Sequence, residues 1–433
     1  MWPDLPRLAS LHASDVLLGF TFYYPLFMAW VWIVGGLWFY LRHERPAAGG
    51  PARPPPLDEA PPCSILIPCF NEEENLEDTV AYALRTRYPE FEVVAVDDGS
   101  SDATGPMLDR LARTHSRLRV IHLTENQGKA VALRVGAAAA RHDYLVCIDG
   151  DAMLHPHAVR WMMEHLVHGS RVGAVTGNPR IHNRSSLLGK VQVGEFSSII
   201  GLIKRAQRTY GRIFTVSGVI AAFSRAALQR VGYWNDDMAT EDVDVSWRLQ
   251  MDHWDIRYEP KALCYIYMPE TLPGLWRQRL RWARGGVEVL LRYGRDLLSW
   301  RARRFWGVAL EHLASVTWSY AMLIVVVLFL LGLVVPLPPE WRIPTLLPTW
   351  AGVLLGMTCL IQFLVSLWLD RIYEASGFLR NFFWVIWYPL LYWVLSMLTV
   401  VVAVPGTLLA RRRTRARWAH VDRGIHAENP EAK

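Results

Sequence analysis

The stretch Tyr144-Leu145-Val146-Cys147-Ile148-Asp149-Gly150-Asp151 passes from a continuous apolar run directly into two carboxylates. A run without polar alternation is typical of a strand that is buried on both faces of a parallel sheet. Similar runs before it alternate with helix-like segments, so the chain predicts a doubly wound α/β domain whose ligands bind beyond the carboxyl ends of the strands. We expect strands at residues 63–68, 91–97, 118–123 and 144–149, and helices at residues 72–85, 102–114 and 129–141.

The two acidic residues at the end of this strand are candidate metal ligands. Residues two apart in an extended chain face the same way, so Asp149 and Asp151 can both point at one cation. Two carboxylates together with a diphosphate suit Mg²⁺ or Mn²⁺, which are hard ions that prefer oxygen ligands. An ordinary Asp-Gly turn is the alternative, and the place of the pair at a strand end favours metal binding.

Missing motifs exclude several other ligand classes. No G-x-G-x-x-G follows the first strand, and Gly128-Lys129 lacks the first glycine of a P-loop. The five cysteines form no C-x-x-C pair, which argues against a zinc site or a redox dithiol and fits a reducing compartment. Much of the net charge of +6 lies in an arginine-rich tail, so nucleic acid is not implied as a partner.

Four stretches of the 433-residue chain carry no charged residue and are long enough to cross a bilayer. They are residues 16–41, 313–339, 343–369 and 381–410. The region between the first two stretches reads like a soluble protein, although 52% of the whole chain is apolar and only 20% is charged. This pattern predicts a soluble domain inserted between membrane segments, and it excludes both a simple soluble enzyme and a polytopic transporter.

Basic residues that flank the membrane segments predict the side of the soluble domain. Arg42 and Arg45 follow the first segment, so the positive-inside rule makes the domain cytoplasmic and the protein a multi-pass protein of the inner membrane. Three further crossings would place the basic tail from Arg411 outside, against the same rule. We therefore expect one C-terminal stretch, residues 381–410 with Pro389 inside it, to lie in the interface or to re-enter, which leaves the tail cytoplasmic.

These patterns divide the chain into six parts. They are an N-terminal transmembrane segment (1–42), a linker rich in proline, alanine and glycine (43–62), the α/β domain (63–270), an amphipathic interfacial helix (271–300), a C-terminal transmembrane region (301–410) and a basic tail (411–433). A basic run beside a long apolar segment is first of all a membrane-surface anchor, so the expected contacts of the tail include lipids.

Two further clusters carry chemical groups. Thr240-Glu241-Asp242 reads as a helix start, with Thr240 as a possible N-cap and acids in the first turn. Either these acids only stabilise the helix terminus, or one of them is a general base. Gln278, Arg281 and Trp282 share one face of the helix expected over residues 272–291. Arginine pairs with phosphate and tryptophan stacks on sugar rings, whereas the alternative is an amphipathic helix on the membrane surface; both can hold together.

Five motifs, in this order and spacing, resemble those of the processive family 2 glycosyltransferases, which include cellulose, chitin, hyaluronan and poly-N-acetylglucosamine synthases. They are Ile67-Pro68-Cys69-Phe70-Asn71-Glu72, Asp97-Asp98-Gly99-Ser100, Asp149-Gly150-Asp151, Thr240-Glu241-Asp242 and Gln278-Arg279-Leu280-Arg281-Trp282. Further segments resemble the subfamily of bacterial poly-β-1,6-N-acetylglucosamine synthases, over nearly the whole chain. They are residues 175–180 and 194–205, Arg415-Ala416-Arg417-Trp418, and Asp422-Arg423-Gly424-Ile425. One departure is the N-terminus, where we count one span and some relatives carry two.

The resemblance implies a GT-A-type fold and a donor site of known composition. It implies that Pro68, Phe70 and Glu72 line the uridine pocket, with Phe70 where relatives often have tyrosine. It also implies that Asp98 bonds the uracil or ribose and that Lys129 reaches the diphosphate.

The resemblance likewise implies the catalytic roles. Asp149 is expected beside the donor sugar and diphosphate, Asp151 as the metal ligand and Asp242 as the base. The diphosphate and the acceptor sugar are expected to be held by Glu241, Gln278, Arg279, Arg281 and Trp282. An inverting transfer needs one base on one side of the sugar and cationic stabilisation of the leaving diphosphate on the other.

The function implied is a hexosyltransferase that polymerises N-acetylglucosamine from uridine diphosphate N-acetylglucosamine (UDP-GlcNAc) into a β-1,6-linked biofilm polysaccharide and helps to export the growing chain. The alternatives are another family 2 synthase of the hyaluronan, chitin or cellulose kind, a single-transfer enzyme acting on a lipid phosphate, and a degenerate membrane receptor. The resemblance also suggests a small membrane partner that confers indirect control by cyclic di-GMP, because the chain has no obvious sensor domain.

Overall fold

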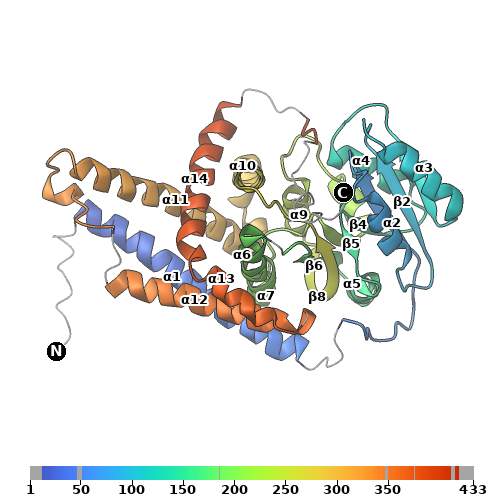
Figure 1. Ribbon diagram of the computed structural model, residues 1–433, viewed down its shortest axis with the longest axis horizontal. Coiled ribbons are helices and arrows are strands. Elements are labelled where there is room, and N and C mark those ends of the chain that lie inside the picture. The colour runs from blue at the N-terminus through green and yellow to red at the C-terminus, as the bar shows by residue number, and fades with distance from the viewer. Residues whose placement is uncertain are drawn as a thin grey trace, which may run out of the picture.

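The structure is a computed structural model that describes residues 12–45, 51–184, 186–346, 350–374, 376–410 and 415–418. It has two regions (Figure 1): an α/β domain, and a group of long helices that extends away from it. The tail residues 411–414 and 419–433, which include Arg411 and the segment from Asp422 to Ile425, lie outside the described residues.

The first half of the sheet is parallel, as the apolar runs predict. It consists of β1 (Cys63–Cys69), β2 (Phe91–Asp97), β3 (Leu118–His122) and β4 (Tyr144–Ile148), with β1 between β2 and β4. Ile65 and Ile67 lie in the core on one face and Leu66 in the core on the other, which explains the lack of polar alternation. The connecting helices are α2 (Leu76–Leu84), α3 (Thr104–Thr114) and α4 (Lys129–Ala139).

The second half of the sheet is mixed, which the expectation of a parallel sheet missed. The strands are β5 (Met153–Leu154), β6 (Val172–Ile181), β7 (Ile220–Ser224) and β8 (Asp255–Ile266), and the order across the sheet is β3-β2-β1-β4-β7-β6-β8-β5. β7 is antiparallel to both β4 and β6. Between β6 and β7 the chain forms α6 (Leu187–Phe196), the π-helical segment η3 (Ser197–Ile203) and α7 (Lys204–Tyr210), and it then returns along β7 in the opposite direction. The remaining helices of the domain are α5 (Ala158–His168), α8 (Arg225–Val231) and α9 (Glu241–Met251).

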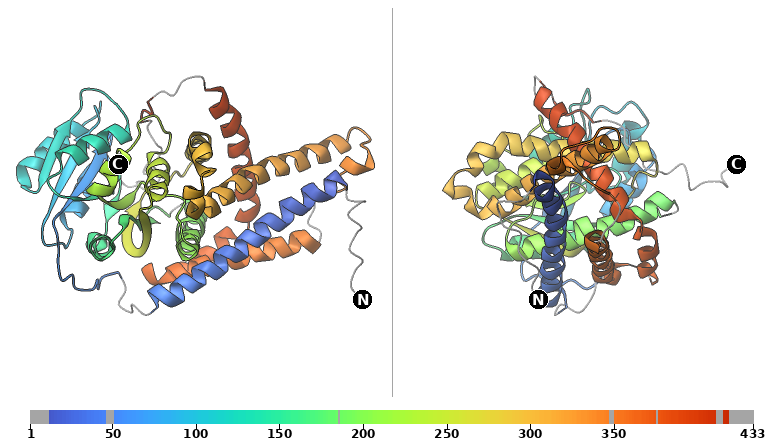
Figure 2. Two further views of the ribbon diagram at one scale, coloured as in Figure 1. Left: turned by 180° about the vertical axis from the view of Figure 1, so that it is seen from behind. Right: turned by 90° about the vertical axis from the view of Figure 1, so that its left-hand side faces the viewer.

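Four helices are long and apolar enough to cross a membrane in the part of the chain that the structure describes. They are α1 (Ala13–Phe39), α11 (Trp306–Gly332), α12 (Trp350–Asp370) and α14 (Tyr388–Leu409). α14 runs steeply across the other three (Figures 1 and 2). The uncharged stretch 381–410 is split into α13 (Phe382–Val385) and α14, so it is not one straight span.

The amphipathic segment forms α10 (Leu272–Leu297), which is longer than the predicted 272–291. Thr271 caps its N-terminus by accepting a hydrogen bond from the Gly274 N–H at 3.2 Å. α10 packs on both α9 and α14, and the short 3₁₀ segment η4 (Trp300–Phe305) then leads into α11. The helix therefore joins the α/β domain to the membrane helices.

A buried ionic cluster, here called the junction cluster, ties the two regions together. It comprises the carboxylates of Glu44, Asp370 and Glu374 and the guanidinium groups of Arg180, Arg184 and Arg205. Arg205 of α7 lies 2.6 Å from Glu44 at the end of the first membrane helix and 2.9 Å from Asp370 at the end of α12. Arg180 of β6 pairs with Asp370 and Glu374. Three positive and three negative groups therefore balance.

Candidate active site

Lys129, the first residue of α4, lies at the centre of the acidic residues that the sequence analysis selected. Its ammonium nitrogen lies 2.6 Å from Asp149 Oδ1 and 2.9 Å from Glu241 Oε1, and it donates to the Gly218 carbonyl oxygen at 3.1 Å. An ammonium group has three N–H donors, and these three oxygens match them. The Lys129 ammonium lies between two acidic residues and holds them together, and its expected contact with a diphosphate stays a prediction.

The carboxylates at the end of β4 occupy the edge of the sheet as predicted. Burial raises the pKa of Asp149, and the nearby Asp151 carboxylate adds to the rise, while Lys129 opposes it. Gly150 between them contacts the uridine-pocket residues, because a Cβ there would lie 3.1 Å from the Pro68 carbonyl oxygen and 3.0 Å from Glu72 Cγ. The ends of β1 and β4 are therefore in direct contact, and Pro68 and Glu72 adjoin the Asp149 and Asp151 pair.

The N-terminus of α9 supplies the second pair of carboxylates. Asp242 accepts hydrogen bonds from the backbone N–H groups of Gly218 at 3.1 Å and Val243 at 3.0 Å. It therefore also bonds the helix terminus, so that the capping and catalytic interpretations coexist in one side chain. Thr240 is the N-cap residue, but its side chain makes no capping bond.

The two acids of this pair have different protonation properties. Burial and the neighbouring Glu241 carboxylate raise the pKa of Asp242 to about 6, although Lys129 and Arg281 oppose the shift. Burial also acts on Glu241, but the close Lys129 ammonium outweighs it and lowers the pKa of Glu241. A general base works best with a pKa near the operating pH, so Asp242 is the better base of the two.

α10 brings its motif to these acids through a close helix contact. At Gly285 any Cβ would collide with the side chain of Thr240, so only glycine permits this approach of α10 to the start of α9. Arg281, one turn earlier on α10, is thereby near enough to Glu241 and Asp242 to favour the charged form of both. Arg281 of the Gln278–Trp282 motif is thus part of the acidic site.

Phe70 and Asp98, on the other side of the Lys129 group, are covered by the tail. The rings of Phe70 and Trp418 are nearly parallel, at an interplanar angle of 17° and a centroid distance of 6.3 Å. The Trp418 backbone exchanges two hydrogen bonds with the Asn126 side chain, and the Ala416 N–H donates to the Asp236 carbonyl oxygen at 2.8 Å. Trp418 therefore lies over the expected uridine pocket.

Asp98 is placed beneath this pocket. It is fully buried, and its two carboxylate oxygens accept the backbone N–H groups of Gln127 at 2.9 Å and Gly128 at 2.7 Å. Gly128 has a φ of 95°, and a Cβ there would collide with the Ala416 carbonyl oxygen. Asp98 holds the loop against which the tail packs, and its expected bond to the uracil or ribose stays a prediction.

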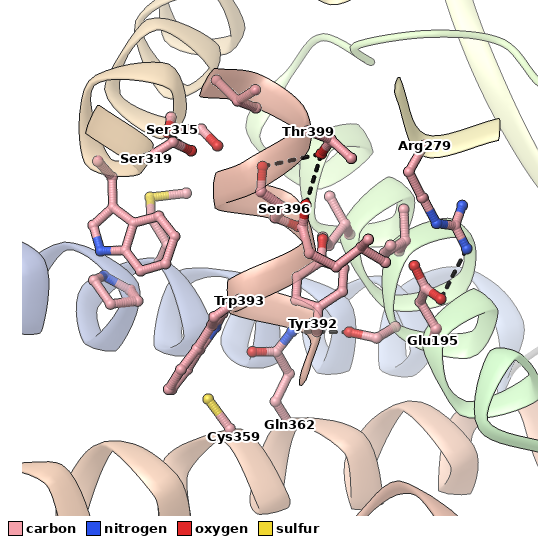
Figure 3. A pocket seen from close by; sticks show the side chains of 18 of the residues that line it. Glu195, Arg279, Ser315, Ser319, Cys359, Gln362, Tyr392, Trp393, Ser396 and Thr399 are labelled. Carbon is pink, nitrogen blue, oxygen red and sulfur yellow. Dashed lines mark hydrogen bonds and ion pairs between the residues drawn. The ribbon is translucent and has the colours of Figure 1, made fainter. Parts of the chain in front are cut away.

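Arg279 and Trp282 line a space beside the membrane helices, whereas Gln278 contacts Met268 of the α/β domain. Arg279 is buried, lies over the Trp282 ring at 4.3 Å and pairs with Glu195 at 2.8 Å. Gln278 Nε2 points at the Met268 sulfur at 3.9 Å. Arg279 and Trp282 line a cavity of about 320 Å³ between α10 and the membrane helices (Figure 3). Arg279 and Trp282 therefore lie on the side of α10 that faces the membrane helices.

Two residues of the site, Lys204 and Gly218, were not selected as candidates from the sequence. Lys204 is buried and donates to Thr176 Oγ1 at 3.1 Å, and burial lowers its pKa to about 7 although Asp242 opposes the shift. Gly218 bridges Lys129 and Asp242 through its backbone. Lys204 lies within a segment already noted for its resemblance, which was the only available hint.

The chemistry of the acidic residues fits a divalent cation bound together with a ligand. Asp149 and Asp151 are carboxylates on one strand end, the donor type that Mg²⁺ and Mn²⁺ prefer. Within the described ranges, no three His, Cys, Asp or Glu side chains gather around a common point. A cation held here would therefore take its remaining ligands from a diphosphate and from water.

Comparison with known proteins agrees with this geometry. Residues 61–285 match the family described as "Glycosyltransferase like family 2". The chain belongs to this family. This family 2 glycosyltransferase is similar to proteins named poly-beta-1,6-N-acetyl-D-glucosamine synthase. The protein of Staphylococcus epidermidis is 37% identical over 408 residues, and that of Staphylococcus aureus strain COL is 38% identical over 408 residues; each match covers 94% of this chain and 98% of the relative.

A solved structure supports the fold of this glycosyltransferase. It is a mannosyltransferase from Pyrobaculum calidifontis, in complex with GDP-Man and Mn²⁺, with a TM-score of 0.62 and 20% identity. The match covers 92% of this chain and 98% of that chain. The GT-A-type domain expected from the motifs, flanked by apolar helices, is therefore confirmed.

Proposed function

We propose that this glycosyltransferase polymerises N-acetylglucosamine from UDP-GlcNAc into a β-1,6-linked chain and passes the chain into the membrane. The observation that carries the proposal is the path along α10. Arg281 adjoins the acids of α9, and Trp282, the next residue, lines the cavity beside the membrane helices. The sugar and the linkage rest on the identity to the named synthases.

The transfer is a single in-line displacement at the anomeric carbon. Asp242 takes the proton of the acceptor hydroxyl as that oxygen attacks, and the bond to the diphosphate breaks on the opposite face of the sugar. Arg281 favours the charged forms of Asp242 and Glu241 from the α10 side, and Lys129 fixes Glu241 against Asp149. These charges hold the base in place before the acceptor arrives.

The donor nucleotide binds in the pocket formed by Phe70, Trp418 and the loop that Asp98 holds. The parallel rings of Phe70 and Trp418 offer two aromatic faces for the uracil, and the loop held by Asp98 closes the pocket below them. Asp149 and Asp151 would hold a divalent cation, which when bound neutralises charge on the leaving diphosphate. Both acids lie at the strand end that contacts Pro68 and Glu72.

The growing polymer leaves through the cavity of Figure 3. Its lining combines aromatic rings and hydroxyl groups, which suit the apolar faces and the hydroxyls of a sugar chain. The lining side chains include Trp32, Trp318, Tyr392, Trp393, Ser396 and Thr399. The same apolar lining fits the hydrocarbon chain of a lipid-linked acceptor, which is the second candidate.

The experiment is polymer synthesis by the full chain reconstituted in vesicles. Labelled UDP-GlcNAc and three other nucleotide sugars are supplied with Mg²⁺ or Mn²⁺, and the products are sized and their linkage is determined. We expect long β-1,6-linked chains from UDP-GlcNAc alone. A lipid-extractable product with one sugar would support the second candidate, and a long polymer from another sugar would support another synthase of the family.

Orientation and partners belong to the same proposal. The tail residues 415–418 lie on the glycosyltransferase domain, so the tail and the domain share one side, which the positive-inside rule makes cytoplasmic. α1, α11 and α12 then cross the membrane and α14 lies across them. The small partner subunit and cyclic di-GMP control stay predictions.

A further inference from the structure

Among the described residues, those that line a hollow between the glycosyltransferase domain and the start of α11 are all basic. Its volume is about 320 Å³, and its lining residues are Arg171, His253, Arg301, Arg303 and Arg304. They come from three places: the turn before β6, the turn between α9 and β8, and the η4 segment. None belongs to the site of Lys129 and Asp242.

The positive charge of this hollow is not neutralised inside the protein. Among the described residues, none of the four arginines has a carboxylate partner within ion-pair distance. The nearby Asp255 already pairs with Arg208 at 3.1 Å and, more loosely, with Arg212 and Arg257. Burial lowers the pKa of Arg212, and Arg304, Arg208 and Arg171 lower it further, although Asp255 opposes the shift. The field at the hollow is therefore strongly positive.

The hollow also lies at the level of a membrane surface. η4 leads directly into α11, whose 27 residues extend for about 40 Å, longer than the ~30 Å hydrocarbon core of a bilayer. Beside the arginines, the side chains of Leu298 and Trp300 are 84% and 68% exposed. Exposed apolar groups next to unpaired guanidinium groups match the boundary between acyl chains and headgroups.

We propose that this hollow binds a phosphate group, that of an anionic phospholipid headgroup in the leaflet next to the domain. One guanidinium group can bind phosphate through two parallel hydrogen bonds. The three elements bring their basic residues to one hollow, whereas arginines scattered over a surface would not meet at one point. His253, in the left-handed backbone region at a φ of 69°, is one of the residues that line the hollow. A bound headgroup would fix the start of α11 against the domain.

The test uses the purified full chain in neutral detergent with phosphatidylglycerol or phosphatidylcholine, and native mass spectrometry to count retained lipid. The variant is Arg171→Gln with Arg304→Gln, which removes one charge from each of two elements. The matched control is Arg110→Gln with Arg113→Gln on α3, exposed arginines of the same number far along the chain from η4. A parallel arm measures the thermal shift with inorganic phosphate alone.

We expect the wild type and the control to retain phosphatidylglycerol and the variant to bind it about thirtyfold less tightly, the effect of two basic residues near a charged surface. A thermal shift with inorganic phosphate that is lost in the variant, without lipid retention, would support the same phosphate site with a soluble ligand. Equal behaviour of the variant and the control in both arms would overturn the proposal. Neither result depends on polymer synthesis.

Discussion

The junction cluster and the site cluster, both buried and both made of described residues, differ in the balance of their charges. The junction cluster matches three carboxylates with three arginines, and its best buried members have side chains at most 5% exposed. The site cluster sets four carboxylates, Asp149, Asp151, Glu241 and Asp242, against Lys129, Arg281 and Lys204, and burial lowers the pKa of Lys204 to about 7, so that its ammonium is only partly charged at neutral pH. A balanced cluster holds elements together, whereas an unbalanced one leaves a carboxylate with a raised pKa and room for added cations.

The largest expected effect is the loss of transfer in Asp242→Asn. The amide fills the same volume but cannot take the proton, so we expect a ~10²–10⁴-fold loss of polymer synthesis. The Asn amide has one acceptor oxygen where Asp242 uses two, so we expect at most a small fall in the thermal unfolding temperature. The measurement is the rate of sugar incorporation, together with UDP binding, which should persist. Synthesis near the wild-type rate would assign Asp242 to helix capping alone.

The second prediction tests the junction cluster with Arg205→Met. Removing Arg205 leaves the buried Glu44 without its arginine partner and Asp370 with Arg180 alone, and breaking a buried ion pair typically costs ~3–5 kcal/mol. We expect a large fall in the unfolding temperature, with activity lost only as far as the fold is lost. Arg208→Met on the same helix is the control, because its pair with Asp255 has side chains about one quarter exposed and such pairs contribute little. Equal effects of the two substitutions would remove the distinction between the clusters.

The extent to which the sequence predicts these features differs between the two halves of the sheet. The four parallel strands follow from apolar runs, because burial on both faces selects Val, Ile and Leu at every position. β7 is antiparallel because the chain first passes through α6 and α7 beside the membrane helices. No local sequence pattern predicts this path. The candidate site residues at the strand ends could be selected from the sequence, because their polar side chains interrupt apolar runs.

The pairing of these residues was not predictable in the same way. Lys129 meets Asp149 of a neighbouring strand end and Glu241, which lies more than a hundred residues further along the chain, and the second contact depends on how β7 and α9 are placed. Arg279 belongs to the same motif as Arg281, but the helix turns it toward Glu195 and away from Glu241 and Asp242. The junction cluster also joins β6, α7 and the ends of two membrane helices, and no spacing in the sequence connects them.

The third prediction concerns Trp418, which lies outside both clusters and acts through its ring. Base stacking on an aromatic side chain is worth ~1–3 kcal/mol, so Trp418→Ala should raise the KM for UDP-GlcNAc by about five- to 150-fold and leave kcat nearly unchanged. Trp418→Phe keeps a ring and is the matched variant, with a smaller rise. The measurement is initial rate against donor concentration. An unchanged KM in the alanine variant would show that the tail rests on the domain without contacting the nucleotide.

The smallest effect is a shift in pH dependence, and it tests the imbalance of the site cluster directly. Asp242 must be ionised to act as a base, and its pKa is raised to about 6, so activity should fall tenfold for each pH unit below that value. Glu241 contributes to this rise, whereas its own pKa is lowered, so Glu241 stays ionised over the same range. Glu241→Gln removes the negative neighbour of Asp242. It also leaves the Lys129 ammonium with one carboxylate partner in place of two, and both changes favour the charged form of Asp242. The acid limb of the rate profile should therefore move to lower pH in Glu241→Gln, even if the maximal rate declines. If Glu241 were the base instead, the same substitution would abolish activity at every pH, and Asp242→Asn would retain it.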